Sequence, residues 1–343
     1  MAGPIKRLRQ NAKQYKIVRD CHAALVAAES YACDASRFLR KSGMVRPSSL
    51  PVLEAQITMD YHRVEKGLTL PNPNPWFGRE TITRLVVNCL EYNGHSNADS
   101  TILHGAVGAL QAYAGTFSDE PCDWWRDLAP QVHILSTSIL GEGVAGGTEP
   151  FTGAPPESSR WDFSEFARTR SSVRNFAPKP VDAQIIRNAI RTAQFTPSVC
   201  NRQPTRVRIF ERGHYADRIL MTQNGNRGFG NTASHVLLLS SDLSAFVTPG
   251  ERNQGFIDGG MFAMTLIYAL HDQGVSSCCL NWSAPRRQDR RLRRVVALPN
   301  HEVVIMMIAI GFPADGAVVT VSPTREFARV VLDPATDIGS GKS

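Results

Sequence analysis

Two short stretches of the sequence gather side chains that bind phosphate groups and heterocycles. The first, TRSSVRNFAPKPV (residues 169–181), brackets Ser171 and Ser172 with Arg170 and Arg174. Guanidinium groups bind phosphate oxygens through paired hydrogen bonds, and hydroxyl groups add further donors. The same residues are also compatible with an ordinary solvated turn, so the interpretation depends on what else in the chain would contact that phosphate.

The second stretch is TPSVCNRQPTRVRIF, residues 196–210, which places Pro197, Ser198, Asn201 and Gln203 in one loop. A planar amide offers a donor and an acceptor side by side, which suits the edge of a heterocycle with alternating carbonyls and ring nitrogens. By itself, the loop is equally compatible with an Asx-turn before a strand.

Other motifs carry less chemistry. Residues 141–146 form a G-x-G-x-x-G, but TEPFTGAPPESS follows, and its prolines prevent the helix that a dinucleotide site requires. We therefore interpret this segment as a linker. The nine histidines show no H-E-x-x-H, and G-x-S-x-G is absent, so we expect neither a metal site nor a serine nucleophile.

Residues 286–294 contain six arginines within a predicted helix whose apolar residues Leu292, Val295 and Val296 face inward. A solvated helix face is the favoured interpretation. Docking of an anionic substrate or of the NADPH phosphate remains an alternative. A nucleic-acid helix would usually add aromatic or base-reading residues, and these are missing nearby.

The composition is that of a soluble protein, with 42% hydrophobic residues and a net charge of +7, which suggests anionic partners without naming one. The seven cysteines form no C-x-x-C pair and indicate reduced thiols. The basic N-terminus is followed by no hydrophobic signal region, and the longest apolar run is too short for a membrane helix. We expect a cytoplasmic protein without an integral membrane segment.

The chain changes character along its length. Residues 1–140 predict a mostly helical extension, with helices over 15–40, 80–93 and 100–117, and residues 141–160 predict a linker. Residues 161–343 alternate helices and strands, which predicts an α+β domain. The expected helices there are 181–194, 254–274 and 284–298, and the expected strands are 206–212, 235–243, 275–282 and 302–312.

In this order, the segments resemble the nitroreductase family of FMN-dependent oxidoreductases over about residues 165–332. The resemblance rests on the 170–176 segment, on a P-S-x-x-N-x-Q-P loop at 197–204, and on an apolar helix that ends at Gly274. It is completed by Leu298-Pro299 and by the I-A-I-G-F-P pattern of residues 308–313. No single motif is strong, but the ordered set is specific.

The resemblance implies an α+β sandwich that forms a homodimer with FMN at the subunit interface. It implies that NADH or NADPH delivers hydride to the flavin and that a small-molecule acceptor then takes the electrons, in a ping-pong cycle. No catalytic protein residue is implied. The implied FMN-binding residues are Arg170, Ser171, Ser172, Arg174, Pro197, Ser198, Asn201, Gln203, Leu280, Asn281 and Arg325.

Two positions depart from the family pattern. Ser171 stands where many members carry a second arginine or a histidine, and Asn281-Trp282 is an unusual pair beside a flavin. Trp282 is compatible with stacking on a substrate or with filling the pocket.

The helical extension contains YHRVEKGLTLPNPNPWFG, which is similar to a segment of nitroreductase-like proteins from polysaccharide gene clusters. His62, Arg63, Glu65 and Lys66 in this segment would line a site or, more in keeping with charged helix ends, cap a neighbouring domain.

Three hypotheses follow. The favoured one is an FMN-dependent NAD(P)H oxidoreductase. The second is a flavin-fold protein whose site is covered by its own extension, acting as a binding or assembly component. The third is a basic nucleic-acid or membrane-surface binder that uses the 286–294 arginines.

Overall fold

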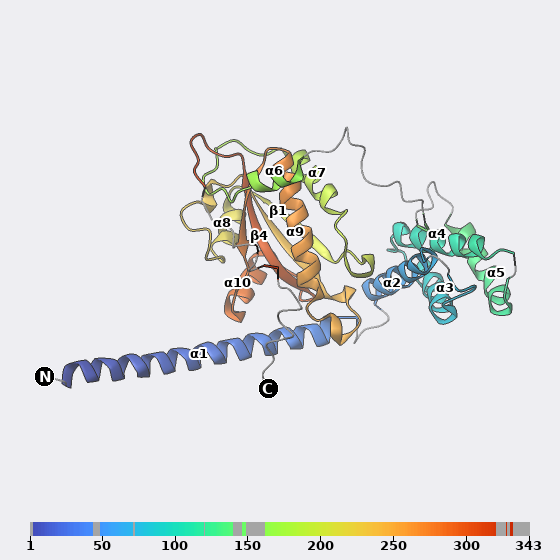
Figure 1. Ribbon diagram of the computed structural model, residues 1–343, viewed down its shortest axis with the longest axis horizontal. Helices are drawn as coiled ribbons and strands as arrows, with labels where there is room; N and C mark the ends of the chain where they lie inside the picture. The colour runs from blue at the N-terminus through green and yellow to red at the C-terminus, as the bar shows by residue number, and fades with distance from the viewer. Residues whose placement is uncertain are drawn as a thin grey trace.

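The structure is a computed structural model that describes residues 3–43, 49–70, 73–119, 121–139, 146–148, 162–319, 327 and 330–331. Figure 1 shows three parts: a long N-terminal helix, a group of four helices, and an α+β core built on one twisted sheet. The α+β class expected from the sequence is confirmed.

The core sheet has four strands in the order β1-β2-β4-β3, and every neighbouring pair is antiparallel. The strands are β1 (Thr205–Glu211), β2 (His235–Asp242), β3 (Ser276–Asn281) and β4 (Glu302–Gly311). All eight residues of β2 are buried because it lies in the middle of the sheet with helices on both faces. β1 and β3 form the two edges.

Helices cover both faces of this sheet. On one face, α7 (Ala183–Ala193) and α9 (Gln254–Asp272) pack with Leu237 and Leu239. On the other, α8 (His214–Leu220) and α10 (Arg286–Val296) pack with Val236 and Leu238. The alternation along β2 sends neighbouring side chains to opposite faces. The short α6 (Phe163–Thr169) lies against α9 through Phe163, Phe166 and Tyr268.

The helical unit comprises α2 (Leu50–Leu68), α3 (Arg79–Asn93), α4 (Ser100–Thr116) and α5 (Asp123–Ser138). It has its own core, in which Tyr92 and Tyr113 are fully buried. Asp60 is also buried and accepts two hydrogen bonds of 2.7 Å from Arg84, which satisfies a carboxylate that burial alone would penalise. Sequence patterning did not predict α5, because Pro130 interrupts its apolar periodicity.

The long helix α1 (Gly3–Lys41) joins the core at its C-terminal end, where the Phe38 side chain packs with Leu243 and Phe246. Arg37 forms a 2.8 Å ion pair with Asp289, which attaches α1 to α10.

The domain boundaries at 140 and 160 stay predictions, since most of the 141–160 segment lies outside the described residues. Within it, Gly147 donates its backbone N–H to Glu65 of α2 at 3.0 Å.

None of the helices that the structure describes is long and apolar enough to cross a membrane. Likewise, no group of three or more His, Cys, Asp and Glu side chains within the described ranges is arranged to hold a metal ion.

Candidate cofactor site

The arginine segment (residues 170–174) runs along the outer edge of β3. The Val173 N–H donates to the Ser277 carbonyl at 3.1 Å, and Ser172 forms a parallel bridge with Ser277. Val173 is buried and fixes the segment in place. Arg170 is half-buried and Arg174 is exposed, and neither has an ion-pair partner in the part of the chain that the structure describes.

The two guanidinium groups act electrostatically on the neighbouring strand. Burial raises the pKa of the Cys278 thiol, while the charges of Arg174 and Arg170 act in the opposite direction. Burial likewise raises the pKa of Cys279, and Arg170 opposes that shift. The segment therefore presents positive charge along an accessible strand edge, which is what an anionic phosphate requires.

The amide loop (residues 196–203) has a very different backbone. Three of its non-glycine residues have positive φ: Cys200 at 48°, Asn201 at 52° and Gln203 at 45°. Such conformations cost on the order of 1–3 kcal/mol each and persist only where surrounding contacts impose them. Here the Ser198 hydroxyl accepts the Gln203 backbone N–H at 2.9 Å. The Gln203 side-chain amide donates to the side-chain carbonyl oxygen of Asn201 at 3.3 Å.

Arg202 and Asp258 hold this loop in place through hydrogen bonds and an ion pair. Arg202 is buried, donates to the carbonyls of Val199 at 3.2 Å and Ala245 at 2.7 Å, and forms an ion pair with Glu251. Asp258 of α9 accepts the Val199 N–H at 3.2 Å. Sequence analysis missed both residues, because a charged side chain in a polar loop gives no sign that the fold will bury it.

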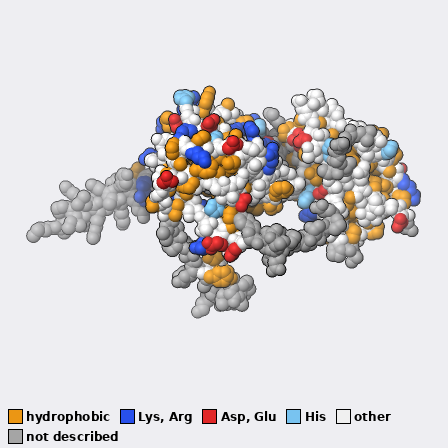
Figure 2. Space-filling model, turned by 90° about the horizontal axis from the view of Figure 1, so that it is seen from above, with side chains coloured by type: hydrophobic (Ala, Val, Ile, Leu, Met, Phe, Trp, Pro, Cys, Tyr) orange, Lys and Arg blue, Asp and Glu red, His pale blue; other side chains and the backbone are white. Residues whose placement is uncertain are grey.

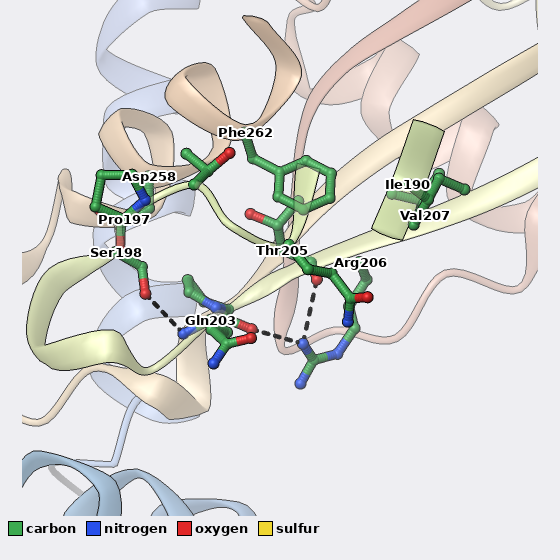
Figure 3. Close-up of a pocket in the computed structure, with 12 residues that line it drawn as sticks. Ile190, Pro197, Ser198, Gln203, Thr205, Arg206, Val207, Asp258 and Phe262 are labelled. Carbon is green, nitrogen blue, oxygen red and sulfur yellow. Dashed lines mark hydrogen bonds between the residues drawn. The ribbon is translucent and has the colours of Figure 1, made fainter. Parts of the chain in front are cut away.

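A hollow of about 300 Å³ lies beside the amide loop, and Figure 3 shows Ser198 and Gln203 on one side of it and Phe262 of α9 on the other. Its lining is mixed: Ile190, Val207 and Phe262 are apolar, while Gln203, Arg206 and Asp258 carry polar groups. Arg206 donates to the Gln203 carbonyl at 3.0 Å. The Thr196 hydroxyl, also in the lining, is buried without a hydrogen-bond partner among the described residues. Apolar walls with a few converging polar groups are typical of a ligand site.

The arginine segment and the amide loop lie at diagonally opposite corners of the sheet. The arginine segment pairs with β3 at Ser277, which is in register with Ile310, His235 and Glu211 across the sheet. The amide loop instead precedes Thr205, at the other end of β1. Four interstrand spacings and about six residues along a strand separate the two, a distance on the order of 28 Å. One chain therefore does not bring them together.

The remaining expected residues divide in the same way. Leu280 has its side chain buried in the core, so only its backbone is available to a ligand. Asn281 is exposed on β3. Its side-chain amide donates to the Ser283 hydroxyl at 3.1 Å, and its backbone carbonyl accepts from the Gln223 side chain at 3.1 Å. Pro197 is exposed and lines the hollow. Arg325 lies outside the described residues.

The helical unit reaches the amide loop through Tyr61 of α2. Its ring packs on the backbone of Gly105, where an added Cβ would lie 3.1 Å from the ring. Burial raises the pKa of the Tyr61 hydroxyl and Glu65 adds to this, whereas hydrogen bonding with Thr58 and Asn201 acts in the opposite direction. A phenol of the helical unit thus lies beside an amide of the candidate site, a contact that the sequence did not indicate.

The charged residues at the end of α2 are occupied elsewhere. His62 lies 3.5 Å from Glu65, Arg63 pairs with Asp60 at 3.3 Å, and Glu65 also accepts the Gly147 N–H. Both ion pairs lie within α2 itself, and the third contact joins α2 to Gly147, so the capping of a neighbouring domain stays a prediction.

Residues 167–223 match the model of the nitroreductase family, so the resemblance inferred from the motifs is confirmed over this segment. Among curated proteins, iodotyrosine deiodinase 1 of Pongo abelii is 24% identical over 186 residues, covering 46% of this chain and 63% of the relative. The chain thus matches less than two thirds of the length of this relative.

Two solved structures show the extent of the structural likeness. The first is a crystal structure of a protein in complex with FMN from Desulfovibrio desulfuricans, which is 20% identical in sequence to this chain. The superposition covers 51% of this chain and 98% of that one, with a TM-score of 0.45. An FMN-dependent nitroreductase from Clostridium difficile R20291 is 15% identical, with coverages of 49% and 97% and a TM-score of 0.43.

Proposed function

We propose that this protein is an FMN-dependent oxidoreductase that passes electrons from NADH or NADPH to a small-molecule acceptor in a ping-pong cycle. The observation that supports it is the pair of complementary half-sites. The arginine segment offers hydroxyls, and cations without an ion-pair partner among the described residues, which suit a phosphate. The amide loop offers amides beside a hollow of mixed apolar and polar lining, which suits a ring system. The residues present therefore fit FMN chemically.

The protein would bind and orient the cofactor, while FMN, when bound, would supply the redox chemistry. Arg170 and Arg174 would hold the phosphate, with Ser171 and Ser172 along the ribityl chain and Arg325 closing on the phosphate. Asn201 and Gln203 would align the ring edge, and the backbone of residues 280–281 would run beside it.

We further propose a homodimer in which each FMN site uses both chains. In an isologous dimer, the arginine segment of one copy can face the amide loop of the other, although the two are far apart within a chain. α9 supports this arrangement, because it exposes Phe256, Ile257, Met261 and Met264. Two of its glycines differ: a Cβ at Gly259 would lie 2.6 Å from Ile305, whereas a Cβ at Gly260 would meet nothing. Within the chain, therefore, only Gly259 is in a close contact that a side chain would disturb.

A complementation experiment tests this proposal. One chain carries Arg170→Ala with Arg174→Ala, the other carries Asn201→Ala with Gln203→Ala, and the two are co-expressed with different tags. Each homodimer should fail to retain FMN, and the purified heterodimer should bind one FMN per dimer, since one of its sites is intact. A heterodimer that binds none, beside a wild type that binds two, would contradict the shared site.

A second candidate function is favoured by the contacts of α1 and α2 with the amide loop. Tyr61 lies beside Asn201, and Val199 packs against the cluster that contains Phe38. These contacts support a binding or assembly component whose flavin is covered by the helical unit. Such a protein would retain FMN but would not reduce it on addition of NADH or NADPH.

A further inference from the structure

Helix α10 carries more positive charge than its surroundings neutralise. Of its six arginines, Arg286 pairs with Glu29 at 2.8 Å and Arg293 pairs with Asp289 at 2.7 Å. The other four are exposed and have no acidic partner within the described residues: Arg287, Arg290, Arg291 and Arg294. On the face of the molecule seen in Figure 2, by contrast, basic and acidic side chains are interspersed.

The spacing of these arginines opposes helix formation. Arg287 and Arg291 are four residues apart, as are Arg290 and Arg294, and like charges at this spacing destabilise a helix. Arg287 also lies in the first turn, at the positive end of the helix dipole. A bound anion would relieve both effects.

A hollow of about 480 Å³ lies beside this helix, and none of the described residues that line it carries a carboxylate. Its lining consists of Met221, Thr222, Asn224, Pro285, Arg287, Gln288, Arg291 and Arg294. Thr222 and Gln288 already donate hydrogen bonds to carbonyls within the fold. The Arg294 Nε donates to the Arg290 carbonyl at 3.3 Å, but none of the three arginines has an acidic partner among the described residues. Met221, which is 63% exposed, provides an apolar surface among them.

The charge continues into a second hollow of about 500 Å³ on α10, which Arg287 and Arg294 also line together with Arg290. Among the described residues, Glu29 alone contributes an acidic group to its lining, and it is paired with Arg286. The unpaired arginines between residues 287 and 294 span about 10 Å of helix. This length fits two or three linked phosphate groups.

We propose that the α10 hollow binds a small organic molecule with two or more phosphate groups, whose apolar part lies on Met221. A nucleic acid would require a longer basic track and aromatic side chains for its bases, and the described residues that line the two hollows include no aromatic one. The site uses none of the residues assigned to FMN and is independent of the proposed redox function.

Calorimetric titration of the full-length protein with ADP and with inorganic triphosphate tests the proposal. We expect one ADP per chain, and at least a tenfold loss of affinity in Arg291→Gln with Arg294→Gln, because each removes a charge-assisted hydrogen bond. Arg187→Gln, an exposed substitution on α7, is the matched control and should bind as wild type does.

Thermal unfolding provides a second readout. Without ligand, the double variant should melt at a higher temperature than wild type, because it loses like-charge repulsion, and glutamine keeps the helix propensity. ADP should raise the melting temperature of wild type more than sodium chloride of equal ionic strength does.

Three results would overturn the proposal. ADP that stabilises no more than matched sodium chloride would show general screening only. Triphosphate that binds as tightly as ADP would remove the role of Met221. An oligonucleotide whose affinity grows with its length and exceeds that of ADP would assign the arginines to nucleic acid instead.

Discussion

The two halves of the proposed cofactor site are built in opposite ways. The arginine segment is an extended strand edge held by backbone contacts with Ser277, and its guanidinium groups have no ion-pair partner among the described residues. The amide loop has a strained backbone with positive φ at three residues, and hydrogen bonds with Arg202 and Asp258 fix its position. A phosphate tolerates some freedom because long guanidinium groups reach it, whereas a ring edge requires amides at fixed positions. Rigidity is therefore concentrated where orientation matters.

The largest loss of stability should follow from removing the support of the amide loop. Arg202→Met should lower the free energy of unfolding by about 3–5 kcal/mol, because it leaves Glu251 without its buried partner. Urea denaturation measures this. The control is Arg206→Met, which removes an exposed arginine 3.7 Å from Asp242 and should cost less than about 1 kcal/mol. Equal losses in both variants would show that Arg202 gives the loop no special support.

Substitutions in the arginine segment should weaken FMN binding without lowering the free energy of unfolding. Arg170→Ala with Arg174→Ala should weaken FMN binding about 100-fold or more, at about 1.5–3 kcal/mol for each charged hydrogen bond. Quenching of flavin fluorescence measures the affinity, and urea denaturation should match wild type. If Arg187→Ala weakened FMN binding equally, the effect would be one of overall charge.

Acid should affect the two halves unequally. Burial alone would raise the pKa of Glu251, but hydrogen bonds from Arg202 and from the Val247 and Thr248 amides outweigh it and lower the pKa below its ordinary value of 4.5. The unfolded chain then binds this proton at a higher pH than the folded chain does. The stabilisation is present above pH 4.5 and is lost as the pH falls through the folded-state pKa.

Urea denaturation from pH 7 to pH 3.5 measures this dependence. Glu251→Gln should be less stable than wild type at pH 7 and should lose less stability on acidification. Parallel curves for the two proteins would contradict the assignment to Glu251.

The smallest effect concerns the strain itself. Cys200 has a φ of 48°, so Cys200→Gly should relieve the strained backbone, although glycine also loses more entropy on folding. We expect a net stabilisation on the order of 0.5 kcal/mol by urea denaturation. Ser198→Gly, at an extended position with a φ of −133°, should instead destabilise, because it gains backbone freedom and loses the hydroxyl that accepts the Gln203 N–H. Destabilisation of both variants by the same amount would show that the positive φ stores no strain.

The sequence indicated the arginine segment more directly than it indicated the residues that support the amide loop. The charged residues and hydroxyls at 170–174 can be identified directly from the sequence. The α+β core followed from continuous apolar runs such as β4 and from the helical periodicity of α7. The burial of Arg202 depends on Ala245 and Glu251, more than forty residues away, so no local pattern could reveal it.

The helical unit was predicted incompletely for the same reason. Its contact with the amide loop through Tyr61 arises from tertiary packing on Gly105, which spacing does not show. The separation of the half-sites was also hidden, because sequence order does not reveal that β1 and β3 form opposite edges of the sheet.

The most direct measurement is the absorbance spectrum of the purified protein, loaded with FMN and recorded without oxygen before and after addition of NADH or NADPH. The account predicts flavin bands that bleach on addition of one of these donors and return when an electron acceptor is supplied. A colourless protein that fails to take up added FMN would contradict the proposed function. Bound flavin that stays oxidised with both donors would favour the covered site instead.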